Sequence, residues 1–380
     1  MDTIIAPAGL KGVVVADTAT GDVRGQEGFY HFRQYSAVEL ARHRSFEDVC
    51  HLMLEGHLPT PEESAAFADR LAALAALPPE LEELLPGIAR TGADRASLAR
   101  LRTAVSHLGS LEQFPPTWGA DPDRVRADVL RLVATVPTIQ AALHRLRRGE
   151  EPLAPRPELG AAGSWLWMLT GREPAPEHRA AITAYLTSTV DHGFSASTFA
   201  ARVVTSAGSD VASAVCAAVG TFAGPLHGGA PDRALDALDE IGTADRARGW
   251  VRERVAAGER IMGFGHAVYR TTDPRAAMLR EIALGLGGQL ADLAVRVEEE
   301  VVAALAELKP GRELHTNVEY YAGVVMEQCG VPREMFTPTF ATARVVGWGA
   351  HILEQTASPR IFRPSARYTG PQAPAPLPTD

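Results

Sequence analysis

The sequence predicts a mainly α-helical protein with a few short strands near its N-terminus. After residue 36, apolar residues recur at helical spacing over most of the chain. Several segments open with Ser, Thr or Asp followed by Glu or Pro, which is the pattern of a helix N-terminus. The chain has 380 residues, 46% of them hydrophobic, enough for a large core and two or three domains.

The strands are expected within residues 9–24. This segment holds the β-branched run at residues 13–15, and Gly21-Asp22 and Gly25 are expected to form turns. Helices follow. Ser36 and Glu39 stand in capping-box spacing before the first of them.

Two further helices have clear ends. A helix capped by Ser45 is expected to stop at Gly56. Thr60, Pro61 and Glu63 supply the N-cap, first-turn proline and capping-box glutamate of the next helix.

The middle of the chain reads as helices interrupted by prolines. Residues 78–176 are predicted as helical pieces, 172–178 as a loop and 179–190 as a helix. The small, apolar stretch 195–222 is predicted to be one central buried helix.

The pattern of residue types changes after Gly224. A helix is expected to open at Pro231, and apolar residues between 290 and 308 mark a long amphipathic helix. The proline-rich end, from about residue 363, is predicted to be an extended arm. We therefore predict a large helical domain formed by residues 1–222 and 314–380, with a smaller domain inserted at 223–313.

Charge and composition disfavour several classes. The net charge is −9, from 37 basic and 46 acidic residues, so a nucleic-acid-binding protein is not expected. The basic run at 144–148 is interpreted as the solvated end of a helix. No signal peptide or membrane span is apparent, and Cys50, Cys216 and Cys329 show no disulfide or Cys-x-x-Cys pattern. These features predict a cytoplasmic protein in a reducing compartment.

The stretch "IMGFGHAVYRTTDPRA", residues 261–276, carries polar chemistry in an apolar context. Asp273 and Pro274 suit the start of a helix, which places Arg275 in its first turn. A lone cation there is opposed by the helix dipole, so a bound anion is one explanation and a surface turn the other. Gly263 and Gly265 permit unusual backbone angles and close ligand approach beside His266.

Two further histidines stand beside glycines. His227 lies in "GPLHGG" and His192 in "VDHGFSAST", and each is equally compatible with a structural histidine. Three scattered histidines without a cysteine partner or His-x-x-x-His spacing do not predict a zinc site, and no metal site is expected.

Arg344 and Glu319 each leave two interpretations open. Arg344 stands in the apolar stretch 336–355, where a buried guanidinium needs a carboxylate, from Glu354 or from a ligand. Glu319 follows Thr316 in capping-box spacing, so it serves either as a cap or as a catalytic base.

Together these stretches resemble the citrate synthase family. The resemblance is carried by "GPLHGG", "GFGHAVYRTTDPR", "NVE" and "FTPTFATARVVGWGAHILEQ", with support from "GLKGVVVADT" and "DHGFSASTFAARV". The motifs are spread over nearly the whole chain in the family's order. The resemblance implies a mainly α-helical homodimer that condenses acetyl-CoA with oxaloacetate in a cleft between two domains, without a cofactor or a nucleic-acid or membrane partner.

The resemblance also implies a role for each residue. His227 would stabilise the enol oxygen, His266 would polarise the oxaloacetate carbonyl, and Glu319 would be the base. The other implied contacts are with oxaloacetate for His192, Arg275, Arg344 and the partner-reaching Arg363, and with coenzyme A for Arg270, Gly263 and Gly265.

Two positions depart from the family pattern. The family's base is the aspartate of "NVD", whereas this chain has Glu319, and the added methylene moves the carboxylate by about 1 Å unless the backbone compensates. Gly193 stands where the family commonly has glutamate. The open alternatives are a 2-methylcitrate synthase using propionyl-CoA and a catalytically weak paralogue that binds coenzyme A or keto acid.

Overall fold

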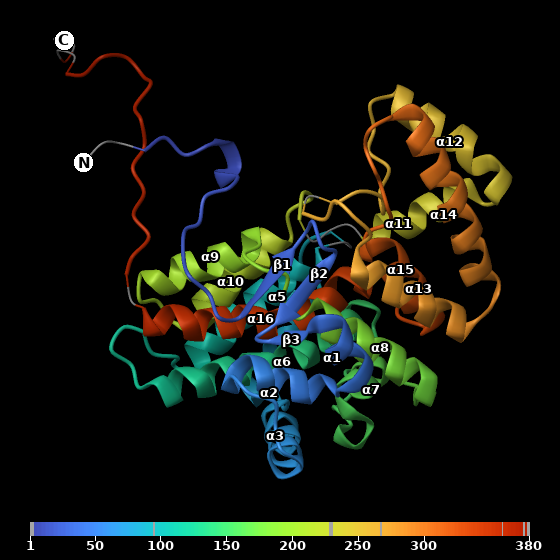
Figure 1. Ribbon diagram of the computed structural model, residues 1–380. Coiled ribbons are helices and arrows are strands. Elements are labelled where there is room, and N and C mark those ends of the chain that lie inside the picture. Colours follow the sequence, from blue (N-terminus) through green and yellow to red (C-terminus); the bar gives the residue numbers. More distant parts are fainter. Residues whose placement is uncertain are drawn as a thin grey trace.

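The fold is known from a computed structural model. It describes residues 4–93, 96–227, 231–266, 268–358, 360–374 and 377, and side chains are described for these except at 231–233. The predicted mainly α-helical class is confirmed, and helices cover most of the described chain (Figure 1).

A small antiparallel sheet lies near the N-terminus, and only its first strand falls within the predicted segment 9–24. Its strands are β1 (Gly21–Arg24), β2 (Phe29–Phe32) and β3 (Tyr35–Ser36), in the order β1-β2-β3. The run at 13–15 forms no strand; Val14 is 84% exposed and has no neighbouring strand to pair with. Gly21 belongs to β1 rather than to a turn, and a Cβ there would meet the His31 carbonyl oxygen at 2.3 Å.

Helices α1 to α10 form the larger body of the molecule. Their bounds are α1 (Ala37–His43), α2 (Phe46–Glu55), α3 (Pro61–Leu74), α4 (Pro79–Ala89), α5 (Ser97–Leu111), α6 (Pro122–Arg147), α7 (Gly160–Thr170), α8 (Pro176–Thr189), α9 (Ala196–Ser206) and α10 (Val211–Phe222). Short 3-10 turns occupy Ala8–Leu10, Pro157–Leu159 and Arg333–Met335.

The predicted helix ends follow local capping chemistry. Ser36 and Ser45 accept hydrogen bonds from the backbone amides three residues on, and Gly56 ends α2 at φ 91°, a left-handed angle that suits glycine. Thr60 and Glu63 form a reciprocal capping box at the start of α3.

Three expectations about the middle of the chain need correction. Stretch 195–222 is two helices, because Asp210 caps a new helix and its side chain accepts from Ser213 N. Helix α8 begins at Pro176, inside the predicted loop, since proline suits a first helical turn. The basic run at 144–148 does end α6, but His144 is only 8% exposed rather than solvated.

A second group of helices gathers on one side of this body (Figure 1). It contains α11 (Pro231–Ile241), α12 (Ala244–Ala256), α13 (Pro274–Leu286), α14 (Gln289–Leu308) and α15 (Val318–Gln328). The predicted helix starts at Pro231 and Pro274 and the long helix near 290–308 are confirmed. The domain limits at 223 and 313 stay a prediction.

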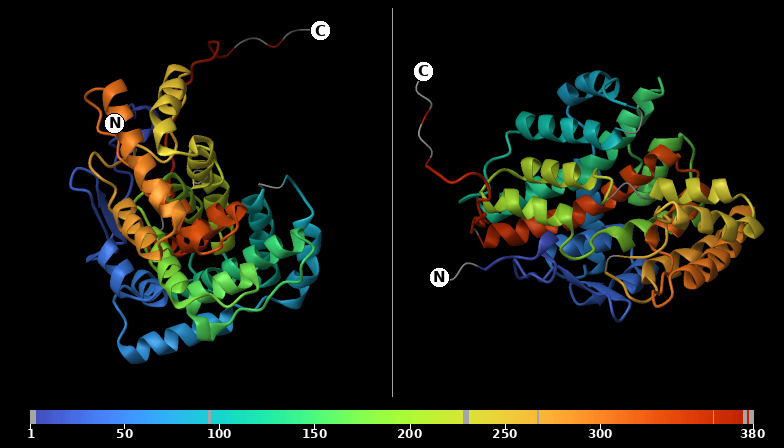
Figure 2. Two further views of the ribbon diagram at one scale, coloured as in Figure 1. Left: turned by 90° about the vertical axis from the view of Figure 1, so that its right-hand side faces the viewer. Right: turned by 90° about the horizontal axis from the view of Figure 1, so that it is seen from above.

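Helix α16 (Phe336–Ala357) runs through the middle of the larger body and packs against α2, α6, α8, α9 and α10 (Figure 1). Most of its residues are buried. The chain beyond it runs away from the helices as an extended arm (Figure 2). No helix in the described chain is long and apolar enough to cross a membrane.

Candidate active site

A cavity of about 650 Å³ brings together most of the predicted site residues. Its walls come from the loop after α8, the segment after α10, the loop before α13, and helices α13, α15 and α16. The residues that line it are His192, Ser195, Pro225, Leu226, His227, Glu259, Arg260, Met262, Gly265, His266, Arg275, Asn317, Val318, Glu319, Phe340 and Arg344.

The glycine-rich segment before His266 is held against the start of α15. Gly263 and Gly265 have φ values of 83° and 81°, so the expected unusual angles are present. Asn317 binds both: its backbone N–H donates to the Gly263 carbonyl at 2.9 Å and its side-chain amide to the Gly265 carbonyl at 2.9 Å. A Cβ on Gly263 would also crowd Tyr320 at 3.1 Å.

The imidazole of His266 has one nitrogen committed to the backbone. Its Nδ1 accepts from the backbone amides of Val268 and Tyr269, at 2.9 and 3.0 Å. A nitrogen that accepts two N–H groups carries no proton, so neutral His266 holds its proton on Nε2, and Arg275 Nη2, 3.4 Å from that nitrogen, does not donate to it. Burial and the nearby Arg275 lower the pKa of His266 to about 4, so the neutral form prevails at neutral pH.

Arg275 is not the lone cation that the sequence suggested. Asp273 pairs with it within the same helix start, at 3.0 Å from Nε to Oδ1 and 2.8 Å from Nη2 to Oδ2. The same carboxylate caps α13 and accepts the Val318 amide at 3.1 Å. Asp273 therefore supplies the negative charge that offsets a cation in the first turn of a helix, and both side chains are buried.

Arg344 is held without a carboxylate partner. Its Nε donates to the Thr189 carbonyl oxygen at 2.9 Å, and no acidic side chain in the described chain lies within ion-pair distance. Glu354 is not its partner: it binds Arg202 at 2.6 Å, because ten helical residues place it about 15 Å further along the axis. Burial lowers the pKa of Arg344 to about 10, with Asp191 opposing that shift.

His192 and Tyr269 connect the loop after α8 to the loop before α13. His192 Nε2 lies 3.0 Å from the Tyr269 hydroxyl, and its ring stands 5.5 Å from that of His266. Burial, with the positive charges of Arg275 and Arg344, lowers the pKa of His192 well below its usual value. His192 is therefore a neutral group that faces His266.

His227 is oriented by a hydroxyl rather than by the backbone alone. Ser197 Oγ lies 2.8 Å from His227 Nε2, and the Trp348 indole N–H donates to the same oxygen at 3.1 Å. Since Trp348 supplies its own proton, the Ser197 hydroxyl is free to donate to Nε2, which leaves the imidazole proton on Nδ1. Burial, with a smaller effect from Arg344, lowers the pKa of His227 to about 4.

Glu319 does not share a capping box with Thr316. Asn317 caps α15 by accepting from the Glu319 amide at 3.1 Å, while the Thr316 hydroxyl donates to Glu298 at 2.6 Å. Asn317 is the better placed cap because its side chain stands directly at the helix start. The Glu319 carboxylate instead lines the cavity, where burial raises its pKa to about 7 despite the opposing effect of Arg275.

Three predicted site residues are not part of the cavity lining: Gly263, described above, Arg270 and Arg363. Arg270 is exposed beside it and donates to the carbonyl oxygens of His266 and Tyr269 at 3.3 and 3.2 Å. Arg363 stands on the extended arm, where it donates only to the Pro364 carbonyl in the described chain. Gly228 and Gly229 of the "GPLHGG" motif lie outside the described residues.

The sequence reasoning missed four residues that orient the others: Asp273 as a partner, Asn317, Ser197 and Tyr269. Asp273 and Asn317 stand within two residues of predicted ligands, so proximity was a signal. Tyr269 stands next to the predicted Arg270, so it gave the same signal, although it meets His192 across a long sequence separation. Ser197 gave none, because it meets His227 across 30 residues. Arg260, exposed at the cavity, was also missed.

Known proteins resemble the chain over nearly its full length. The family model "Citrate synthase, C-terminal domain" matches residues 9–365. A Synechocystis citrate synthase is 36% identical over 370 residues, covering 97% of this chain and 92% of that protein. A Mycobacterium tuberculosis 2-methylcitrate synthase is 37% identical over 362 residues, covering 95% and 90%.

A solved structure gives the same result for the fold. It is a citrate synthase from Thermoplasma acidophilum in a ternary complex with carboxymethyl coenzyme A and oxaloacetate, which aligns with a TM-score of 0.87 and 28% identity over 97% of each chain. The chain belongs to the citrate synthase family, a group of condensing acyltransferases.

Proposed function

We propose that the protein condenses acetyl-CoA with oxaloacetate and hydrolyses the resulting citryl-CoA to citrate and coenzyme A. One observation carries this proposal. A single cavity holds a carboxylate with a pKa of about 7, two neutral histidines whose donor nitrogens are set by their partners, and two buried arginines. These are the groups needed to form an enol and direct it at a keto acid.

Glu319 is the proposed base. A carboxylate with a pKa near 7 is about half ionised at neutral pH and accepts a proton from a weak carbon acid better than an ordinary glutamate. The proton comes from the methyl group of acetyl-CoA. The electron pair of that C–H bond then forms the enol double bond, and the thioester oxygen becomes the enol oxygen.

His227 is the proposed donor to that oxygen. A neutral imidazole with its proton on Nδ1 can hydrogen-bond the developing enolate without first losing a charge. Because Ser197 and Trp348 fix the ring, little reorganisation is needed as charge develops.

His266 and the arginines are proposed to hold oxaloacetate. The Nε2–H of His266 would polarise the keto carbonyl, while Arg344, Arg275 and His192 bind the carboxylates. The enol carbon attacks the keto carbon and the carbonyl oxygen gains a proton. Water then cleaves the thioester of citryl-CoA, and coenzyme A leaves as the thiol. Arg270, Gly263 and Gly265 are the proposed coenzyme A contacts, and no cofactor is required for these steps.

A thiol-release assay tests the proposal. The purified protein should release coenzyme A thiol from acetyl-CoA only when oxaloacetate is present. Acetyl-CoA alone is the control for simple thioesterase activity. No release with either acetyl-CoA or propionyl-CoA at high protein concentration would contradict the proposal and leave a binding paralogue.

The acyl chain is decided by the same assay run with propionyl-CoA. One methylene is worth only about 1–3 kcal/mol in a pocket, so the two substrates differ modestly in affinity. The similarity to both a citrate synthase and a 2-methylcitrate synthase does not separate them. We propose acetyl-CoA as the preferred substrate, and a higher kcat/KM with propionyl-CoA would reverse that assignment.

We further propose a homodimer in which Arg363 reaches the partner's cavity. Its position on an extended arm, outside the lining of its own chain's cavity, is the supporting observation. Arg363→Ala should raise the KM for oxaloacetate. Mixed with Arg344→Met, it should recover about a quarter of wild-type activity, because half the dimers are mixed and each has one intact site. No recovery after confirmed subunit exchange would contradict this arrangement.

The proposed compartment is the cytoplasm. Cys50, Cys216 and Cys329 are free thiols, which suits a reducing environment.

A further inference from the structure

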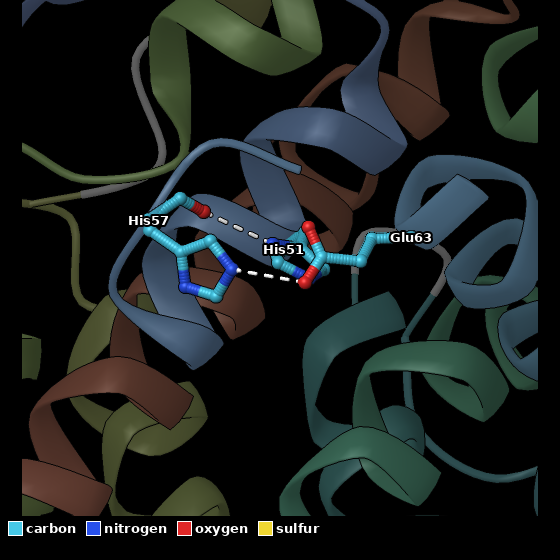
Figure 3. Close-up of side chains that lie close together, drawn as sticks. All are labelled: His51, His57 and Glu63. Atoms are coloured by element: carbon cyan, nitrogen blue, oxygen red, sulfur yellow. Dashed lines mark hydrogen bonds and ion pairs between the residues drawn. The ribbon is translucent and has the colours of Figure 1, made fainter. Parts of the chain in front are cut away.

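A cluster of possible metal ligands lies outside the cavity, where α2 gives way to α3. It consists of His51, His57 and Glu63, spaced six residues apart (Figure 3). One ligand atom from each lies within 4.8 Å of the other two. None of the three lines the active-site cavity.

The hydrogen bond of His51 leaves one of its ring nitrogens with a lone pair. Its side chain is only 5% exposed, and its Nδ1 lies 3.0 Å from the His57 carbonyl oxygen. A carbonyl only accepts, so Nδ1 must carry the proton and Nε2 must hold the lone pair. Histidines that bind metals usually donate their other ring N–H in this way.

Glu63 has one oxygen committed and one available. Its Oε2 accepts from the Thr60 backbone amide at 2.8 Å, as part of the α3 capping box. Its Oε1 faces His57 Nε2 at 3.4 Å, which is long for a charge-assisted hydrogen bond. Ligands about 2.1 Å from a tetrahedral ion stand roughly 3.4 Å apart, so this spacing suits a shared ion.

The described part of the chain also contains a matched pair with no third ligand beside it. His43 Nε2 and Glu39 Oε2 lie 3.5 Å apart on α1, and both are exposed, as His57 and Glu63 are. A surface pair of this kind contributes little to stability and requires no ion. The buried, oriented His51 is what distinguishes the α2–α3 cluster from it.

We propose that His51 Nε2, His57 Nε2 and Glu63 Oε1 bind one divalent ion of the zinc class. Two imidazoles and one carboxylate suit Zn²⁺ or Co²⁺ rather than Mg²⁺ or Ca²⁺, which prefer oxygen ligands. Water would fill the fourth position, since His57 and Glu63 are open to solvent. The ion would tie the C-terminal turn of α2 to the first turn of α3, and α2 in turn packs on α16.

Titration of the untagged full-length protein with ZnCl₂ and CoCl₂ tests this site. One equivalent of Co²⁺ should give the visible absorption of a tetrahedral ion, and Zn²⁺ should displace it. His57→Gln and Glu63→Gln should each weaken binding by at least tenfold, whereas His43→Gln should not. Glutamine at position 63 retains the capping box, so a folding defect is not expected.

Thermal unfolding and the cavity histidines supply the remaining controls. Excess Zn²⁺ should raise the Tm of the wild type relative to EDTA, and should do so less in His57→Gln. His266→Asn should bind Zn²⁺ as the wild type does. The proposal is overturned if no stoichiometric binding occurs, if His43→Gln weakens binding equally, or if binding is lost in His266→Asn and kept in His57→Gln.

Discussion

The cavity's two buried arginines are held in opposite ways. Arg275 meets Asp273 through two contacts of 3.0 and 2.8 Å, so its charge is balanced inside the protein. Among the described residues, Arg344 contacts the Thr189 carbonyl oxygen and the Phe340 ring, 4.8 Å from its guanidinium carbon, but no carboxylate. The pKa of Arg275 is raised by Asp273, while burial lowers that of Arg344 to about 10.

Because of this difference, we expect the two arginines to contribute differently to the stability of the protein and to the attraction of a ligand. A buried charge without a partner costs free energy that a ligand carboxylate can recover on binding. We therefore expect Arg344 to supply more of the net attraction for an anionic ligand. Arg275 is fixed in direction by Asp273, so we expect it to contribute mainly to orientation, where a misplacement of about 1 Å can cost roughly a hundredfold in rate.

The largest expected effect is on the stability of Arg275→Met. This change leaves Asp273 buried without its partner, which should lower the free energy of unfolding by about 3–5 kcal/mol. Arg344→Met removes an uncompensated charge and one hydrogen bond, so the same quantity should change by less than about 1 kcal/mol. Denaturant unfolding of both variants measures the contrast, and equal losses would break it.

A double variant provides the control for this contrast. Asp273→Asn combined with Arg275→Met removes both charges, and asparagine still caps α13. It should be more stable than Arg275→Met alone, because no unpaired carboxylate remains. Greater instability of the double variant would mean that packing, not charge balance, explains the first result.

The next largest effect concerns Glu319, which lies on the Arg275 side of the cavity. Glu319→Gln keeps the shape but removes the proton acceptor, so kcat should fall by about 10²-fold or more. Affinity for oxaloacetate should persist, because His192, His266, Arg275 and Arg344 are unchanged. Kinetics and equilibrium binding measure the two quantities, and unaltered turnover would exclude Glu319 as the base.

A shorter side chain at position 319 tests whether the backbone has adjusted to glutamate. Glu319→Asp withdraws the carboxylate by about 1 Å, so activity should fall if the cavity is built around the longer side chain. We expect such a loss. A gain in kcat would instead indicate a degraded aspartate site.

The pH profile follows from the same carboxylate. The pKa of Glu319 is about 7 and the base works deprotonated, so kcat/KM should rise with pH up to about 7 and then level off. Below that value it should fall about tenfold per pH unit. His227 and His266, with pKa values of about 4, stay neutral across this range and add no second limb. A profile that is flat between pH 5 and 8 would contradict the assignment.

Sequence alone predicted the fold class, the starts of helices such as α1, α2, α3, α11 and α13, and seven of the residues that line the cavity. Helix starts are encoded locally: Thr60, Asp273 and the prolines after them act within one turn. Periodicity could not divide stretch 195–222, because its small apolar residues continue through the Asp210 cap.

The partners of the site residues were harder to predict than the residues themselves. Asp273 was seen only as a cap, and its second role depends on how the Arg275 side chain folds back. Glu354 was wrongly weighed as a partner of Arg344, since composition cannot show that Arg202 occupies it. The spacing of His51, His57 and Glu63 matches no familiar metal-ligand motif. Their proximity depends on the conformation of the loop between α2 and α3, which the sequence does not reveal.

The smallest expected effect concerns a second comparison, between the ways in which His266 and His227 are oriented. Backbone amides fix the proton of His266, whereas the Ser197 hydroxyl fixes that of His227. Ser197→Ala removes this hydroxyl and should lower kcat about tenfold, the equivalent of one hydrogen bond of roughly 1.4 kcal/mol. The KM for oxaloacetate should stay unchanged, because the residues proposed to bind that substrate are unaltered. Thr205→Val, which removes a buried hydroxyl from the same helix without touching the cavity, is the matched control. An equal loss of kcat in both variants would show that α9 is merely destabilised, and a change confined to KM would mean that Ser197 acts on binding instead of on the orientation of His227.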